Sequence, residues 1–262
     1  MKQKLERFLG YFGLPILQFT EESGRIAIMM YQTLLWVFRR PFRLKLIFKQ
    51  MEEIGVRSLA VVTITALSTG AILALQSYSS FKRFNAENLI GTMVAIALCR
   101  ELAPVLTGLI VAGRVGSAMA AELGTMRVTE QIDALYTLAV NPIHYLIVPR
   151  FLASVLMMPI LTMLADGLGI AGGFFVGTQV YRLNSTVYIR ASFDFLEFED
   201  VYSGLVKSAV FGVVIAIIGC YRGFFTRGGA EGVGKATTSA VVISMMLILI
   251  IDYFMGALFF SV

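Results

Sequence analysis

The sequence predicts an all-α integral membrane protein, with about five transmembrane helices preceded by an amphipathic interfacial helix. Its composition is 57% hydrophobic and 15% charged, which is too apolar for an ordinary soluble domain. A helix needs about 20 mostly apolar residues to cross a hydrocarbon core of about 30 Å. The stretches that meet this requirement are residues 58–80, 89–112, 151–181, 201–221 and 236–260.

Residues 1–57 form a basic, amphipathic segment in front of a transmembrane domain that we assign to residues 58–262. Its apolar run Ile26–Phe38 has 13 residues between Arg25 and the Arg39–Arg40 pair. That is about 20 Å of helix, too short to cross. We expect it to lie in the interface with Trp36 at headgroup depth; a short crossing that thins the bilayer is the alternative.

The distribution of basic residues predicts the orientation. With a cytosolic N-terminus, the inner segments 1–57, 113–150 and 222–235 hold 16 Lys and Arg, against 4 in the outer segments 81–88 and 182–200. Basic residues favour the cytosolic side, so the N-terminus is predicted inside and the C-terminus outside. The net charge of +5 then reflects topology and anionic lipid, and nucleic acid is not expected as a partner.

The connections and the third span carry further signals. The short connection 81–88 predicts antiparallel neighbours in the first two spans. The third span contains Pro159 and the series Gly169, Gly173, Gly177, two overlapping G-x-x-x-G units that let another helix approach closely. Whether that helix belongs to this chain or to a second copy stays open. The aromatic and acidic outer segment 182–200 predicts a helix, a docking surface for a periplasmic partner, or an anchored loop.

The connection between the second and third spans predicts a short cytosolic helix over Glu122–Tyr136. Val128, Ile132 and Leu135 lie within about 60° on a helical wheel, while Glu130 and Asp133 point away. One face therefore fits a groove and the other meets water. A transporter driven by a separate ATPase needs such an element to pass mechanical work to its spans, although this pattern alone is weak.

The residues of this connection make the prediction specific. Residues 121–135, AELGTMRVTEQIDAL, closely resemble the signature loop of the MlaE-type permeases, the membrane subunits of ABC transporters that work with MCE-domain proteins. The resemblance extends to RELAPV at 100–105, AGRVGSA at 112–118, NP at 141–142, VPRF at 148–151 and GFFTRGGAEGVG at 223–234. It implies a coupling helix with ATPase-coupling residues Glu122, Gly124, Arg127, Val128, Glu130, Gln131, Ile132, Asp133 and Leu135.

The resemblance also implies partners and a location. A member of this family is a non-catalytic subunit of the bacterial inner membrane that pairs with a second copy of itself. It binds two ATPase subunits on the cytosolic side, with a small accessory subunit on the ATPase, and an MCE-domain assembly on the periplasmic side. The cargo is phospholipid or a related lipid. ATP and Mg²⁺ would belong to the ATPase, and this chain would need no cofactor.

Residues Gly229–Lys235 read G-x-x-x-x-G-K but are followed by Ala236. A nucleotide-binding P-loop needs Ser or Thr there to bind Mg²⁺, and a strand before the loop. We therefore expect no ATP binding by this chain. The lone His144 is interpreted as an interfacial side chain, and no metal site is predicted.

Ionisable residues inside spans are costly in hydrocarbon and tend to face a cavity or each other. Arg100 and Glu101 lie in the second span, Lys207 in the fourth and Asp252 in the fifth. We expect Glu101, Lys207 and Asp252 to be neighbours beside a lipid cavity, with Arg100 able to meet a phosphate headgroup. A purely structural network that pins three helices together is the equal alternative.

Three further residues are assigned to the cavity. Gln76 and Tyr78, at the outer end of the first span, are expected to line its exit together with Leu102; interface anchoring is the ordinary alternative. Asp166, midway along the third span, is expected to cap a break near Gly167 or to bind nothing.

Two other classes of function remain open. An ion-coupled secondary transporter would use intramembrane carboxylates such as Asp166 or Asp252, usually within inverted repeats, and the sequence shows no repeat. A structural membrane anchor for a complex would not need charges inside its spans.

Overall fold

The structure, a computed structural model, describes the backbone of residues 2–39 and 43–260 and the side chains of residues 17, 20–39 and 43–259. No strand is present in these residues, and five helical segments are long and apolar enough to cross a membrane. They are Leu44–Phe84, Glu87–Val128, Ile143–Val180, Phe198–Phe224 and Gly229–Phe259. The five predicted spans are confirmed, and the helices extend beyond them mainly at the end that carries the basic loops.

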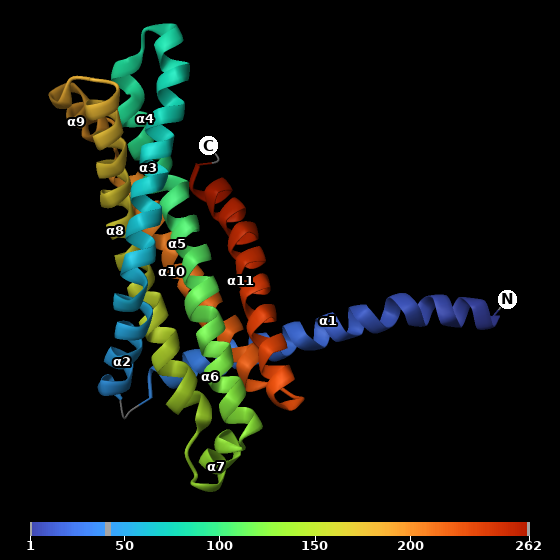
Figure 1. The fold of residues 1–262 in the computed structure, drawn as a ribbon. Helices are drawn as coiled ribbons and strands as arrows, with labels where there is room; N and C mark the ends of the chain where they lie inside the picture. The colour runs from blue at the N-terminus through green and yellow to red at the C-terminus, as the bar shows by residue number, and fades with distance from the viewer. Residues whose placement is uncertain (1, 40–42, 261–262) are drawn as a thin grey trace.

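The spans form a bundle with α7 at one end and the connection between α3 and α4 at the other, and α11 ends on the side of that connection (Figure 1). We refer to these two ends as the inner and outer ends, in line with the predicted orientation. The elements are α1 (Lys2–Val37), α2 (Leu44–Ile54), η1 (Val56–Ser58), α3 (Leu59–Phe81), η2 (Lys82–Phe84), η3 (Glu87–Leu89), α4 (Ile90–Ala97), η4 (Leu98–Leu102), α5 (Ala103–Val111), η5 (Ala112–Gly116), α6 (Ser117–Val128), α7 (Gln131–Thr137), η6 (Ile143–Ile147), α8 (Val148–Phe175), η7 (Val176–Val180), α9 (Ser185–Asp194), α10 (Phe198–Phe224) and α11 (Gly229–Phe260).

Helix α1 runs crosswise at the inner part of the bundle, and its N-terminal half extends away from it (Figure 1). Met29 and Thr33 are buried against the bundle, whereas Tyr31 and Leu35 are exposed. Helix α1 has 36 residues and is much longer than the predicted 13-residue run. Arg40 lies outside the described residues. Apolar side chains on its open faces suit a bilayer surface, and its interfacial position stays a prediction, as does the domain division at residue 57.

The glycine face of α8 packs against α3 of the same chain, which answers the question that the sequence left open. A Cβ atom on Gly70 would lie 1.8 Å from the carbonyl oxygen of Gly169. One on Gly172 would lie 2.3 Å from the carbonyl oxygen of Leu67. Only glycine permits backbones to approach this closely, and dispersion contacts between such faces hold helices together in lipid. Helices α3 and α4 are also in contact, as the short connection predicts.

The outer segment after the third span is helical. Asn184 caps α9 by accepting from the backbone N–H groups of Thr186 and Val187, the usual role of Asn at a helix start. Tyr188 of α9 lies against Gly177, where a Cβ would sit 2.7 Å from the ring. Burial raises the pKa of Tyr188 to about 12, so its phenol stays neutral at physiological pH.

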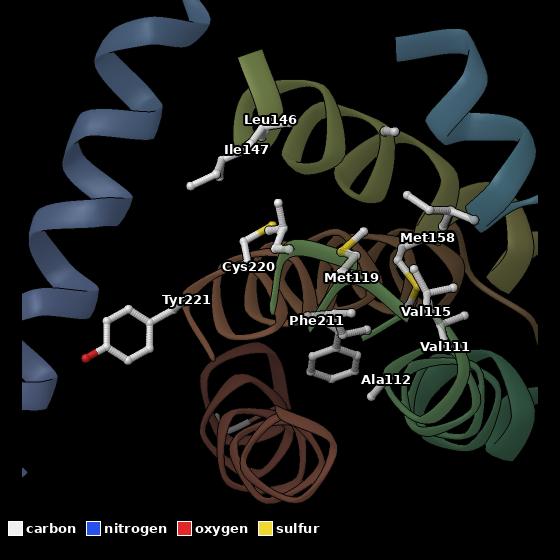
Figure 2. Packing of buried hydrophobic residues seen from close by; sticks show 14 of the residues in the cluster. Val111, Ala112, Val115, Met119, Leu146, Ile147, Met158, Phe211, Cys220 and Tyr221 are labelled. Atoms are coloured by element: carbon white, nitrogen blue, oxygen red, sulfur yellow. The ribbon is translucent and has the colours of Figure 1, made fainter. Parts of the chain in front are cut away.

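The main apolar core lies among the second, third, fourth and fifth spans, towards their inner halves (Figure 2). Phe211 and Ile215 of α10 are fully buried there, beside Val111, Val115 and Met119 of the second span. This core fixes the inner half of the bundle, so the polar side chains of the outer half are held on rigid helices.

We predict that Gly70→Ala destabilises the bundle by about 1–3 kcal/mol, since the new methyl group meets the backbone of α8. Gly167→Ala is the matched control, because nothing lies within 4 Å of its Cβ position. The control should keep or slightly raise stability through helix propensity. Thermal unfolding followed by circular dichroism measures both, and equal midpoints for the two variants would contradict the described packing.

Candidate functional site

A π-helical segment, η4, interrupts the second span at Leu98–Leu102 and carries Arg100 and Glu101. Pro104 follows at the start of α5 and has no N–H to donate to the carbonyl of Arg100, four residues earlier. That carbonyl instead accepts a hydrogen bond from Lys207 Nζ at 3.2 Å. Single π turns occur frequently at functional sites, and this one turns two charged residues and a carbonyl to neighbouring helices.

Lys207 of α10 is fully buried at the centre of an ion cluster, which we define as Arg100, Glu101, Asp200, Lys207 and Asp252. Its Nζ lies 2.7 Å from Glu101 Oε2 and 3.2 Å from Asp252 Oδ1. Three helical spans thus meet at one ammonium group. The predicted juxtaposition of Glu101, Lys207 and Asp252 is confirmed.

Arg100 forms an ion pair with Asp200 in the first turn of α10. Asp200 is buried, and its other carboxylate oxygen accepts the backbone N–H of Glu197 in a capping box. The sequence analysis missed Asp200 because it placed this residue in the outer segment. The spacing Glu197-x-x-Asp200, with acidic side chains at the cap and third helical position, is the signal that identifies it.

Asp166 is buried on α8, and its Oδ1 atom has no hydrogen-bond partner among the described residues. Helix α8 runs without interruption through Gly167, so the predicted cap at a helix break is wrong. The regular helix satisfies its own backbone there, so the Asp166 carboxylate is not needed as a cap.

Exposure divides the ion cluster into two parts. Lys207 and Asp200 have almost no exposed surface, and Asp252 has little. The side chain of Glu101 is 45% exposed and that of Arg100 is 36% exposed. The buried members therefore hold helices together, whereas Glu101 and Arg100 also reach the surface of the bundle.

The three residues assigned to the cavity exit lie near one another without forming one lining. Tyr78 stacks on Tyr181 with ring centroids 3.7 Å apart. Tyr78 and Leu102 both pack against a small apolar cluster whose buried members are Ala74, Ile90, Val94, Leu98 and Tyr188. Gln76 is exposed on α3. Tyr78 thus ties the outer end of the first span to that of the third, and its contact with lipid stays a prediction.

The inner loop differs from the predicted single helix. Helix α6 ends at Val128, Glu130 adopts the left-handed conformation with φ 60°, and α7 starts at Gln131. Val128 and Ile132 therefore belong to different helices, so the shared apolar face predicted for 128–135 is wrong. Ile132 is fully buried in the protein's own core and Leu135 packs against it.

Ion pairs and close packing brace this loop against the spans. Buried Arg150, at the start of α8, lies 2.7 Å from Glu122. Arg127 lies 2.6 Å from Asp133 and bridges α6 to α7. A Cβ on Gly124 would lie 3.1 Å from Thr226 Oγ1 of the last inner loop. A force on α7 is therefore passed to the second, third and fourth spans.

The tip of the loop offers a surface that the sequence analysis missed. Leu138 is 71% exposed and Tyr136 is also exposed, and α7 exposes the polar residues Gln131, Asp133 and Thr137. The helical wheel placed Val128, Ile132 and Leu135 on one apolar face. Because Ile132 is buried, the most exposed large apolar side chains of the loop are those of Tyr136 and Leu138, at the end of α7.

Two other sequence features have structural roles. Trp36 and His144 lie with ring centroids 5.3 Å apart, and Arg39 lies over the Trp36 ring. The P-loop-like residues Gly229–Lys235 form the first turns of α11, with Glu231 paired to Lys235. In the part of the chain with described side chains, no three His, Cys, Asp or Glu residues are grouped to hold a metal ion.

Five apolar spans, a buried ion cluster between three of them and a braced helical loop at one end define a multi-pass membrane permease. Comparison with known protein families gives a match to the permease MlaE family over residues 47–258. The chain belongs to this family.

Characterised and predicted relatives agree with this assignment. A probable ABC transporter permease protein of Rickettsia typhi is 50% identical over 250 residues, covering 95% of this chain and 96% of the relative. The intermembrane phospholipid transport system permease protein MlaE of Haemophilus influenzae is 34% identical over 255 residues, covering 97% and 98%. The chloroplastic protein TRIGALACTOSYLDIACYLGLYCEROL 1 of Arabidopsis thaliana is 39% identical over 236 residues, covering 90% and 67%.

We predict that Lys207→Met destabilises the protein by about 3–5 kcal/mol, since two carboxylates then lose their buried counter-charge. Adding Glu101→Gln and Asp252→Asn should recover most of the loss, because no uncompensated charge remains. The free energy of unfolding in detergent tests this. A single variant as stable as the wild type would show that the ion cluster does not hold the helices.

Proposed function

We propose that the chain is the permease subunit of an ABC transporter that moves phospholipid or a related lipid between the inner membrane and a periplasmic MCE-domain partner. Membership of the MlaE permease family and the name of the Haemophilus influenzae relative, an intermembrane phospholipid transport system permease, support this proposal. Two copies of the chain would enclose a lipid cavity. The chain itself would perform no bond chemistry, since ATP and Mg²⁺ would be held by the ATPase.

The braced inner loop is the observation that carries the ATPase part of the proposal. Its tip presents Leu138 and Tyr136, while Arg127–Asp133 and Glu122–Arg150 tie it to the second and third spans. An ATPase that grips the tip would move α6 and α8 together. Two ATPase subunits, one for each permease copy and each with a small accessory subunit, would sit at this cytosolic end.

The lipid part of the proposal rests on the outer half of the bundle. Apolar walls suit acyl chains, and a few polar groups orient a headgroup. Glu101 and Arg100 are the members of the ion cluster that reach the surface. They would contact the headgroup while Lys207 keeps η4, α10 and α11 in place. The MCE-domain assembly would receive or deliver lipid at this end, which the proposal places on the periplasmic side.

Leu138→Asp should weaken ATPase binding by about ten-fold or more, because it places a charge in an apolar contact. Phe84→Asp is the matched control, since Phe84 is as exposed but lies in the opposite, outer connection. Co-purification with the cognate ATPase, and ATP hydrolysis by the assembled complex, measure the effect. Equal loss in both variants, or in neither, would contradict the proposed docking tip.

A further inference from the structure

A pocket lies directly beyond the ion cluster, between the outer ends of α10 and α11. It is open, has a volume of about 280 Å³ and is lined by Glu199, Tyr202, Ser203 and Phe259. Ser203 is four residues, or about 6 Å of helix, from Lys207. The pocket thus occupies the outward side of the layer where the fourth and fifth spans are pinned together.

Carboxylates outnumber cations in this layer. The ion cluster and the start of α10 contain five acidic side chains and two basic ones. The acidic residues are Glu101, Glu197, Glu199, Asp200 and Asp252, and the basic ones are Arg100 and Lys207. Both basic side chains already lie in ion pairs with carboxylates of the cluster. A cationic ligand would lower the electrostatic energy of this layer, whereas an anionic one would raise it.

The start of α10 is also closed to anions. Free backbone N–H groups at a helix N-terminus ordinarily attract phosphate or carboxylate. Here the side chain of Glu197 accepts the N–H of Asp200, and Asp200 Oδ2 accepts the N–H of Glu197 at 3.1 Å. The protein's own carboxylates thus take two of the backbone donors at this helix start, and their negative charge disfavours an anionic headgroup there.

The pocket combines a carboxylate with aromatic rings. Tyr202 is 52% exposed and its ring stacks on that of Phe198, with centroids 6.0 Å apart. Phe259 contributes a second ring to the lining, and Glu199 is exposed at the same place. Aromatic faces beside a negative charge are the usual chemistry for recognising an ammonium group.

We propose that this pocket binds the ammonium group of a zwitterionic phospholipid, either a primary amine or a quaternary ammonium. Glu199 supplies the opposite charge, while Tyr202 and Phe259 supply the ring faces. The site thereby favours amine-bearing phospholipids over purely anionic ones. The inference rests on the proposed lipid function and adds a headgroup preference to it.

The test measures which lipids the purified full-length chain retains. The chain is reconstituted in vesicles of equimolar phosphatidylethanolamine, phosphatidylcholine and phosphatidylglycerol with identical acyl chains, then extracted and analysed by mass spectrometry. The two amine-bearing lipids should be retained about five-fold over phosphatidylglycerol, the ratio expected from one favourable cation–aromatic contact. Glu199→Gln and Tyr202→Leu should each bring the ratio close to one.

Asp194→Asn is the matched control, because Asp194 is an exposed carboxylate at the outer end but belongs to α9. It should leave the ratio unchanged. Equal retention of all three lipids by the wild type, or a preference that survives both pocket variants, overturns the proposal. So does displacement of a fluorescent choline probe by soluble ethanolamine when no lipid preference is seen, since the pocket would then bind free amines.

The same preparations separate this inference from the proposed function. ATP-driven lipid transfer without headgroup preference would refute the pocket assignment alone. A chain that retains no lipid and supports no ATP-driven transfer with its ATPase would refute the proposed function.

Discussion

The ammonium group of Lys207 is the constraint on which the outer half of the bundle depends. A fully buried lysine in a membrane protein is tolerated only when opposite charges and carbonyls surround it. Here they come from Glu101 and the Arg100 carbonyl on η4 and from Asp252 on α11. Because Pro104 cannot donate to that carbonyl, the interruption of the second span and the burial of Lys207 are two parts of one arrangement.

The two halves of the molecule use different interactions. The outer half carries the ion cluster and the pocket with Glu199, whereas the inner half is an apolar core. Below that core, Glu122–Arg150 and Arg127–Asp133 tie the loop to the spans. A motion imposed on the loop therefore reaches the outer half through continuous packed helices, as the proposed ATP-driven mechanism requires.

The sequence predicted those features that the bilayer itself imposes. Run lengths located five spans, and the cost of isolated charge in lipid predicted the grouping of Glu101, Lys207 and Asp252. The sequence did not reveal the break between α6 and α7 at Glu130, because a left-handed conformation in a residue other than glycine leaves little trace in sequence. The burial of Ile132 depends on contacts with distant helices, and Asp200 was missed because run lengths place it in the outer segment, although it lies in the first turn of α10.

The central claim is that ATP hydrolysis by a partner drives lipid movement through this chain. An ion-coupled transporter would need carboxylates that are available to ions, yet Asp252 is paired with Lys207 and Asp166 is buried. The most direct test is transfer of a fluorescent phospholipid by vesicles that contain the chain and its ATPase, measured with ionophores present. The account predicts transfer that requires ATP and survives collapse of all ion gradients. Transfer that proceeds without ATP and stops when a gradient is collapsed would contradict it.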